Sequence, residues 1–161
     1  MFWLREKTSL IRILLFNMLT KEFKKIVLKT FDSKGYKLTP IEFKDAIPFE
    51  VKRAYYITDF EAGGKTGEHC HKIEEEVFIQ LVGSCTALID KGQGLEEVKL
   101  VGSSEAIYVP NFVWHGFKDA SVDCVILAFS STNYTASRED YIENYGDFKK
   151  TSPYYNHRRL A

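Results

Sequence analysis

From about Lys24 onward, the chain is a series of short runs rich in Val, Ile, Tyr and Phe, and turn residues end each run. Glycine-rich segments such as Gly63-Gly64 and Gly83-Ser84 separate the runs, and no helical period lies between them. Many short strands at close spacing predict an all-β sandwich or barrel. The predicted strands are Ile26 to Thr30, Lys37 to Phe43, Lys52 to Phe60, Glu76 to Val82, Cys85 to Asp90, Glu96 to Leu100, Ala106 to Val109 and Cys124 to Phe129.

The two ends of the chain differ from this pattern. Ser137 to Lys149 predicts a short C-terminal helix, with Ser137 as N-cap and two acidic residues in the first turn, where the helix dipole favours them. A second short helix fits Phe16 to Lys25. We therefore expect an N-terminal extension over residues 1–23 that need not be part of the fold, a β domain over 24–150 and a C-terminal tail over 151–161. Met18 is an alternative start, which would leave the first 17 residues as an upstream extension.

Composition limits the partners. The 161 residues suit one domain, and 22 Lys+Arg balance 22 Asp+Glu, so no overall charge favours nucleic acid or an anionic membrane. The apolar run Ile11 to Leu19 is too short for a membrane span and contains Arg12. We expect a small-molecule partner, and a few local cations could still hold a compact phosphate. Three widely spaced cysteines without a Cys-x-x-Cys pair suit reduced thiols and a cytoplasmic location.

Two histidines supply the main chemical signal. His69 and His71 are two residues apart, so on a strand both imidazoles point to one face while Cys70 points to the other. The spacing of Gly63, His69, His71, Glu76 and Gly83 resembles the first motif of the cupin superfamily. Gly102, Pro110 and His115 follow in the order of its second motif. This resemblance implies a jelly-roll barrel with the histidines inside, although cupins include metal enzymes, metal-free isomerases and simple binders.

A closer resemblance covers nearly the whole chain after residue 38. It rests on Arg53 to Ile57, His69 to Lys72, Gly83-Ser84, Val113 to His115, Asp123 to Leu127 and Asp140 to Ile142 with Tyr145 and Phe148, which look like the sugar-nucleotide 3,4-ketoisomerase family. The resemblance implies a homodimeric enzyme without metal or other cofactor. Its substrate would be dTDP-4-keto-6-deoxyglucose, on routes to 3-amino-3,6-dideoxy sugars of bacterial surface glycans.

Moving a ketone to the neighbouring carbon requires a base near neutral pKa and a group that exchanges protons with the two oxygens. The resemblance gives His69 the role of carbon base and His71 that of oxygen-side shuttle, with Tyr55 as a third catalytic candidate stabilising the enediolate. Arg53 shares the face of Tyr55 and suits a diphosphate, because its guanidinium forks onto two oxygens. The predicted substrate-binding residues are Arg53, Lys65, Glu76, Tyr108 and His115, although His115 could equally be a packed core histidine.

Two departures from the family leave alternatives open. Thr66, with Lys65 beside it, replaces an arginine that relatives usually carry before the first histidine. Glu76 stands where the ketoisomerases usually have glutamine, and it completes a three-histidine, one-carboxylate set that could bind Fe, Mn, Ni or Zn. The alternatives are therefore a metal-dependent cupin enzyme, a 3,5-epimerase acting on the same nucleotide sugar, and a non-catalytic sugar-binding cupin.

Overall fold

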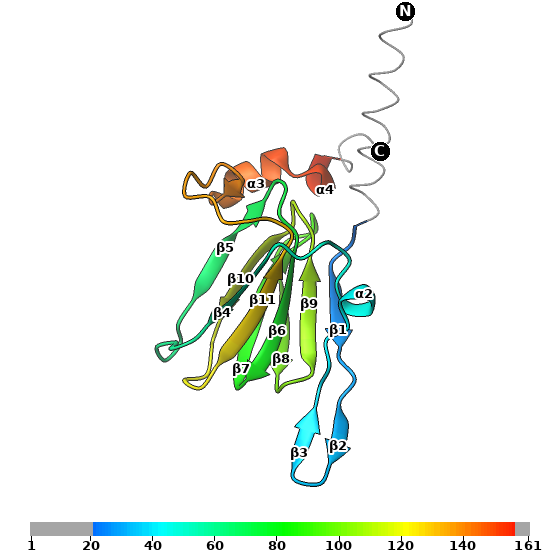
Figure 1. Cartoon of the computed structure of the whole chain (residues 1–161). Helices are drawn as coiled ribbons and strands as arrows, with labels where there is room; N and C mark the ends of the chain where they lie inside the picture. Colours follow the sequence, from blue (N-terminus) through cyan, green and yellow to red (C-terminus); the bar gives the residue numbers. More distant parts are fainter. Residues whose placement is uncertain (1–20, 157–161) are drawn as a thin grey trace, which may run out of the picture.

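The computed structural model describes residues 21–156, and two five-stranded antiparallel sheets form its body (Figure 1). The first sheet has the order β1 (Lys24–Val27), β9 (Glu105–Val109), β6 (Glu76–Val82), β11 (Val125–Ser130) and β4 (Arg53–Ile57). The second has the order β12 (Tyr141–Ile142), β5 (Thr66–His71), β10 (Trp114–Lys118), β7 (Ser84–Asp90) and β8 (Glu96–Val101). The predicted cupin jelly roll is confirmed.

The remaining elements are short. A hairpin of β2 (Phe31–Ser33) and β3 (Tyr36–Leu38) extends away from the sheets, and α2 (Phe43–Ala46) lies beside β1 (Figure 1). Helices α3 (Tyr145–Thr151) and α4 (Pro153–Asn156) end the described chain. No helix within residues 21–156 is both long and apolar enough to cross a bilayer.

Side-chain alternation divides the buried residues into three groups. Between the sheets lies the main core, in which Phe78, Ile107 and Ile126 are almost fully buried. The other face of β6 and β9 packs under the N-terminal segment through a second cluster that includes Val77. The third cluster comprises Cys70, Trp114 and Phe148 and joins the outer face of β5 and β10 to α3. Cys70 is thus a packing residue, on the opposite face of β5 from the two histidines.

The C-terminal prediction was wrong in its boundaries. The helix begins at Tyr145 rather than after Ser137, and its N-cap is Asn144, whose side chain accepts a hydrogen bond from the Asp147 N–H at 3.0 Å. The residues before Tyr145 do not form a helix, because Tyr141 and Ile142 pair with β5 as the edge strand β12. The predicted C-terminal tail contains the last residue of α3 and the whole of α4, and its residues 157–161 lie outside the described residues.

At the N-terminus, a helix was expected over Phe16 to Lys25, but its last two residues, Lys24 and Lys25, belong to strand β1. These two residues pair with Tyr108 and Ile107 of β9. The first part of the expected helix, and the alternative start at Met18, lie outside the described residues.

Two glycines let β5 and β10 approach closely beside the histidines. A Cβ at Gly67, whose φ is +82°, would lie 2.7 Å from the Gly116 Cα. A Cβ at Gly116 would lie 2.7 Å from the Glu68 backbone N. The register of the two strands shifts between His115 and Gly116, which places His115 opposite His69. These glycines therefore bring the two imidazoles together.

Candidate active site

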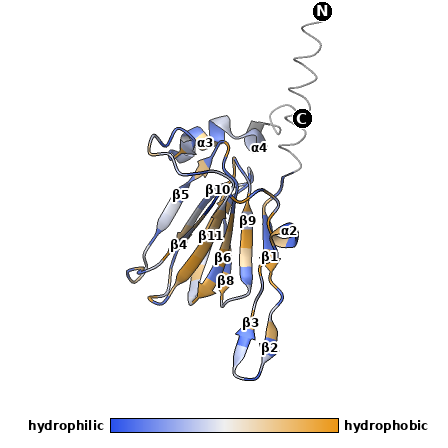
Figure 2. Ribbon diagram, in the orientation of Figure 1, coloured by the Kyte–Doolittle hydropathy of each residue, from blue (hydrophilic) through white to orange (hydrophobic). Residues whose placement is uncertain are grey.

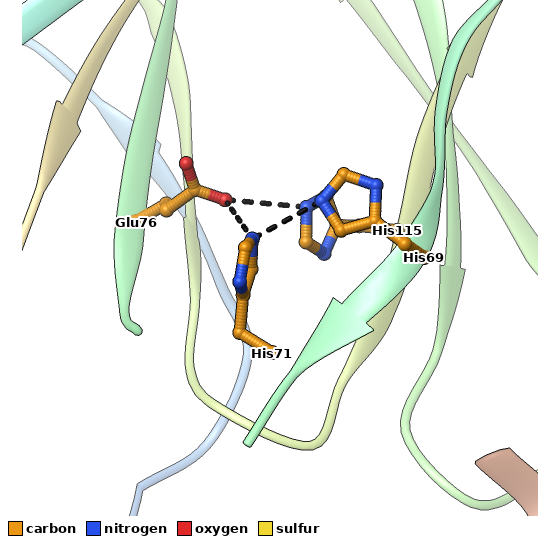
Figure 3. A group of neighbouring side chains, drawn as sticks. All are labelled: His69, His71, Glu76 and His115. Atoms are coloured by element: carbon orange, nitrogen blue, oxygen red, sulfur yellow. Dashed lines mark hydrogen bonds and ion pairs between the residues drawn. The ribbon is translucent and has the colours of Figure 1, made fainter. Parts of the chain in front are cut away.

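Four side chains from three strands meet inside the barrel (Figure 3). His69 and His71 come from β5, Glu76 from β6 of the facing sheet, and His115 from β10. The Nε2 atoms of His69 and His71 are 3.1 Å apart. Glu76 Oε2 lies 3.2 Å from His115 Nε2 and 3.5 Å from His71 Nε2. The first cupin motif therefore forms one polar cluster, with His115 in it rather than packed among apolar side chains alone.

The pKa values of the two β5 imidazoles are shifted in opposite directions. Burial lowers the pKa of His69 to about 3, and the charges of His115 and His71 act in the same direction. For His71, burial alone would lower the pKa, but hydrogen bonds to Asp140 and Glu76 raise it to about 9. Near neutral pH, His69 is therefore uncharged, while His71 carries a proton; the pKa of His69 lies below the near-neutral value expected of the carbon base.

Glu76 is buried and ionised. Burial would raise the pKa of its carboxyl group, but the neighbouring His115 and His71 hold that pKa well below its usual range. Its Oε1 accepts a hydrogen bond of 2.6 Å from the Tyr55 hydroxyl. Burial and the carboxylate raise the pKa of Tyr55, so this hydroxyl keeps its proton. Tyr55, a predicted catalytic residue, thus reaches the cluster from β4.

Arg53 follows the same face of β4 to a neighbouring carboxylate. Its Nη2 donates a 2.6 Å hydrogen bond to Glu74 Oε1, which also accepts from the Ser130 hydroxyl. The Arg53 Nε is buried without a hydrogen-bond partner. The guanidinium therefore lies next to the histidine cluster and keeps one donor unsatisfied.

A cavity of about 230 Å³ opens beside this cluster. Apolar side chains including Phe78 cover one part of it, and His69, His115 and Tyr55 add polar groups. Thr66 lies in its wall, at the position where the family resemblance implies an arginine. The pocket thus offers a largely apolar space with convergent polar groups, as small-ligand sites do.

Two predicted binding residues lie elsewhere. Lys65 is exposed in the segment before β5 and does not line this cavity. Tyr108 lies on the face of β9 opposite the barrel interior, packs in the second cluster, and donates its hydroxyl proton to Glu75. Tyr108 does not join the site because residues on a strand alternate between faces, and Ile107 and Val109 are the ones that point inward.

Sequence reasoning missed two residues that contact the histidines. Asp140 Oδ2 lies 3.0 Å from His71 Nδ1. The ring of Tyr141 packs against both imidazoles, with centroid distances of 4.8 Å to His69 and 4.4 Å to His71. Both residues belong to a segment that the family resemblance includes, yet the helix prediction placed Asp140 only as an acidic residue in the first helical turn. Strand pairing of β12 with β5 brings them in.

The cluster could also hold a metal ion. One donor atom each from His69, His71, Glu76 and His115 lies within 4.8 Å of all the others, and these are ligand types that Fe, Mn, Ni and Zn accept. Glu76 Oε2 is buried without an aligned hydrogen bond, which is compatible with a ligand role. The residues therefore fit either a proton-transfer site or a metal centre.

Known proteins resemble this chain over most of its length. The family described as FdtA: WxcM-like, C-terminal, matches residues 18–152. A curated relative is the TDP-4-oxo-6-deoxy-alpha-D-glucose-3,4-oxoisomerase of Aneurinibacillus thermoaerophilus. It is 41% identical over 128 residues, which are 80% of this chain and 87% of the relative.

Two solved structures show the same fold. One is a mutant of the 3,4-ketoisomerase QdtA from Thermoanaerobacterium thermosaccharolyticum in complex with TDP-4-keto-6-deoxyglucose. It has 32% identity, covers 81% of this chain and 93% of its own, and has a TM-score of 0.74. The other is WlaRA, a TDP-fucose-3,4-ketoisomerase of Campylobacter jejuni, with 30% identity, coverage of 82% and 96%, and a TM-score of 0.73.

Proposed function

Because the chain belongs to the FdtA family, we propose that it is a sugar-nucleotide 3,4-ketoisomerase that converts dTDP-4-keto-6-deoxyglucose to a dTDP-3-keto-6-deoxyhexose. The observation that carries this proposal is the pair of imidazoles in contact at 3.1 Å, one uncharged and one protonated near neutral pH. A ketone shift needs a base and an acid in one place, and this pair supplies both.

In the proposed mechanism, His69 removes the proton from carbon 3 of the substrate. His71 donates its proton to the carbonyl oxygen on carbon 4, which gives an enediol. The hydroxyl on carbon 3 then returns a proton to His71 as its oxygen becomes the new carbonyl. The proton on His69 exchanges with solvent while the enediol is bound, and His69 then delivers a proton to carbon 4, so both imidazoles end in their starting states. Tyr55, held by Glu76, is placed to stabilise charge on the enediol oxygens.

For substrate binding, we assign the diphosphate to Arg53, whose buried Nε lacks a partner. His115 and Glu76 are placed at the sugar, since they border the histidine pair. Lys65 remains a proposed contact on the approach to β5, and Tyr108 leaves the set because of its position on the other face of β9.

The test of this function is product formation. Purified protein is incubated with dTDP-4-keto-6-deoxyglucose and followed by NMR. The proposal predicts that the signals of a 3-keto sugar replace those of the 4-keto sugar. An unchanged substrate spectrum at full ligand occupancy would instead favour the non-catalytic sugar-binding cupin.

Glu76→Gln separates the metal-free mechanism from the metal-dependent alternative, in which the Glu76 carboxylate would be a ligand. We expect this variant to keep turnover within about tenfold of the parent, because glutamine can still accept the Tyr55 hydrogen bond and the family resemblance implies glutamine at this position. The parent itself should keep its activity after dialysis against a chelator. Near-stoichiometric Fe, Mn, Ni or Zn in the purified protein, lost together with turnover on chelation, would contradict the metal-free mechanism.

We also infer that the enzyme is a cytoplasmic homodimer. Three buried free cysteines suit a reducing compartment. The hairpin of β2 and β3 exposes Phe31, Tyr36 and Leu38 to 44%, 62% and 54%, and a second copy could cover these side chains. Light scattering on the eluted protein should give twice the mass of one chain, and the mass of one chain would contradict the dimer.

A further inference from the structure

The carboxylate of Asp140 has its position fixed from several directions. Its Oδ1 accepts a hydrogen bond of 2.7 Å from the Ile73 N–H, and its Oδ2 accepts one of 3.2 Å from the Glu74 N–H. Its backbone carbonyl accepts from the Lys72 N–H at 2.9 Å. Both side-chain oxygens thus accept hydrogen bonds from the turn that follows β5, and the side chain has one defined orientation.

This orientation presents Oδ2 to His71. The distance from Oδ2 to His71 Nδ1 is 3.0 Å, whereas the nearest alternative carboxylate oxygen, on Glu74, is 3.7 Å from the same nitrogen. The opposite ring nitrogen, Nε2, faces His69 and Glu76. Because an ionised carboxylate only accepts hydrogen bonds, the Nδ1 of His71 must donate to it.

We infer that Asp140 is the positioning residue of the proton shuttle. It keeps a proton on His71 Nδ1 and so makes Nε2 the atom that exchanges protons with the substrate. The inference deepens the proposed ketoisomerase function and rests on it for its effect on turnover. The contact itself is a property of the folded protein.

The surrounding fold preserves this contact. β12 pairs with β5 so that Tyr141 lies opposite His71, directly after Asp140. The Tyr141 ring packs edge-on against the His71 ring and restricts its rotation. Beyond β12, Phe148 of α3 is buried against Trp114 of β10, which holds the segment on the sheet. The C-terminal segment therefore delivers one catalytically relevant carboxylate to a ring that β5 provides.

An asparagine at this position cannot reproduce the arrangement. Its amide has one acceptor oxygen, but two backbone N–H groups and the His71 Nδ1–H all need acceptors there. If the oxygen keeps the Ile73 bond, the amide NH₂ faces His71 and favours the tautomer with the proton on Nε2. In that tautomer Nε2 already carries a proton, so the neutral ring cannot take one back from the substrate there. The corresponding change costs other histidine–carboxylate pairs a large part of their turnover.

The experiment compares Asp140→Asn with the parent and with Glu139→Gln, a change at the neighbouring exposed residue. We expect Asp140→Asn to lower kcat by roughly 100-fold or more and to change KM by less than about threefold, since the carboxylate does not touch the substrate. Glu139→Gln should match the parent in both. A loss confined to KM, or a kcat within about threefold of the parent, would overturn the inference.

A second measurement does not depend on turnover or on the stability of the variant. Proton–nitrogen correlation NMR of the imidazoles in the parent protein, with His71→Asn used for assignment, should show His71 with a proton on Nδ1. Lack of that proton would overturn the inference even in an active enzyme. A protonated Nδ1 in a protein that forms no 3-keto product would uphold the contact and reject the proposed function, so the two failures are distinguishable.

Discussion

Replacing His69 with asparagine is expected to lower turnover of dTDP-4-keto-6-deoxyglucose by roughly a thousandfold or more, as the loss of a general base does. Asparagine fits the space of the imidazole but cannot accept the proton from carbon 3. Affinity for dTDP should stay within a few fold, because a base that acts on the sugar contributes mainly in the transition state.

The measurements are the rate of 3-keto product formation and the binding of dTDP by calorimetry. Tyr56→Phe is the matched control, since Tyr56 lies on the outer face of β4 and is 72% exposed. It should behave as the parent does. A His69→Asn protein that loses dTDP binding by a hundredfold would show instead that His69 positions the ligand.

Among the substitutions proposed for this protein, Asp90→Asn is expected to lower the free energy of unfolding most. The Asp90 carboxylate is fully buried at the end of β7. Its Oδ1 accepts from the backbone N–H groups of Gly92, Gln93 and Gly94, and its Oδ2 accepts from the hydroxyls of Tyr145 and Tyr155. An amide supplies one uncharged acceptor oxygen in place of two charged ones, so all five donors lose a charged partner and the tyrosine hydroxyls must turn to accept from the amide NH₂. Hydrogen bonds to a buried charge are strong, and we expect a loss of about 3 kcal/mol in the free energy of unfolding.

The same carboxylate gives stability a defined pH dependence. Burial would raise the pKa of Asp90, but hydrogen bonds from Tyr145, Tyr155 and the loop amides lower it below its ordinary value. A group with a lowered folded-state pKa stabilises the fold above its unfolded pKa, here about 4, and that stability disappears as the pH falls through the folded value.

Urea unfolding at neutral and acidic pH measures both effects. The parent should lose stability as the pH falls below about 4, and Asp90→Asn should lose less over that interval because it lacks the titrating group. Asp45→Asn in α2 is the control, since that residue is exposed. Equal stability of Asp90→Asn and the parent at neutral pH would contradict the role given to this network.

The apolar pattern predicted most of the first sheet, but it did not reveal the strands that carry the histidines. β6, β9 and β11 are strongly hydrophobic, whereas β5 is pale to blue in Figure 2. Each of these two strands contains a glycine, Gly67 in β5 and Gly116 in β10, that lets the strands approach closely. Each also contains polar residues that face the site. Only the spacing of the histidines indicated strand geometry there.

The motif spacing and the family resemblance predicted most of the clustered side chains, Tyr55 and His115 included, but they gave Asp140 no role at the site. His69, His71 and Glu76 follow one motif. Asp140 reaches His71 only through the pairing of β12 with β5, and nothing local distinguishes its role from that of an acidic residue in the first turn of a helix. For Tyr108, alternation defines two faces of a strand, but the face that points inward depends on where the second sheet lies.

The central claim is that protons pass between carbons 3 and 4 through an enediol held by His69 and His71. Incubation of the enzyme with dTDP-4-keto-6-deoxyglucose in deuterated water tests it most directly, with NMR of the product. The expected product is a 3-keto sugar that carries deuterium at carbon 4 and none at carbon 5. Deuterium at carbons 3 and 5 with the ketone still on carbon 4 would contradict it and identify a 3,5-epimerase.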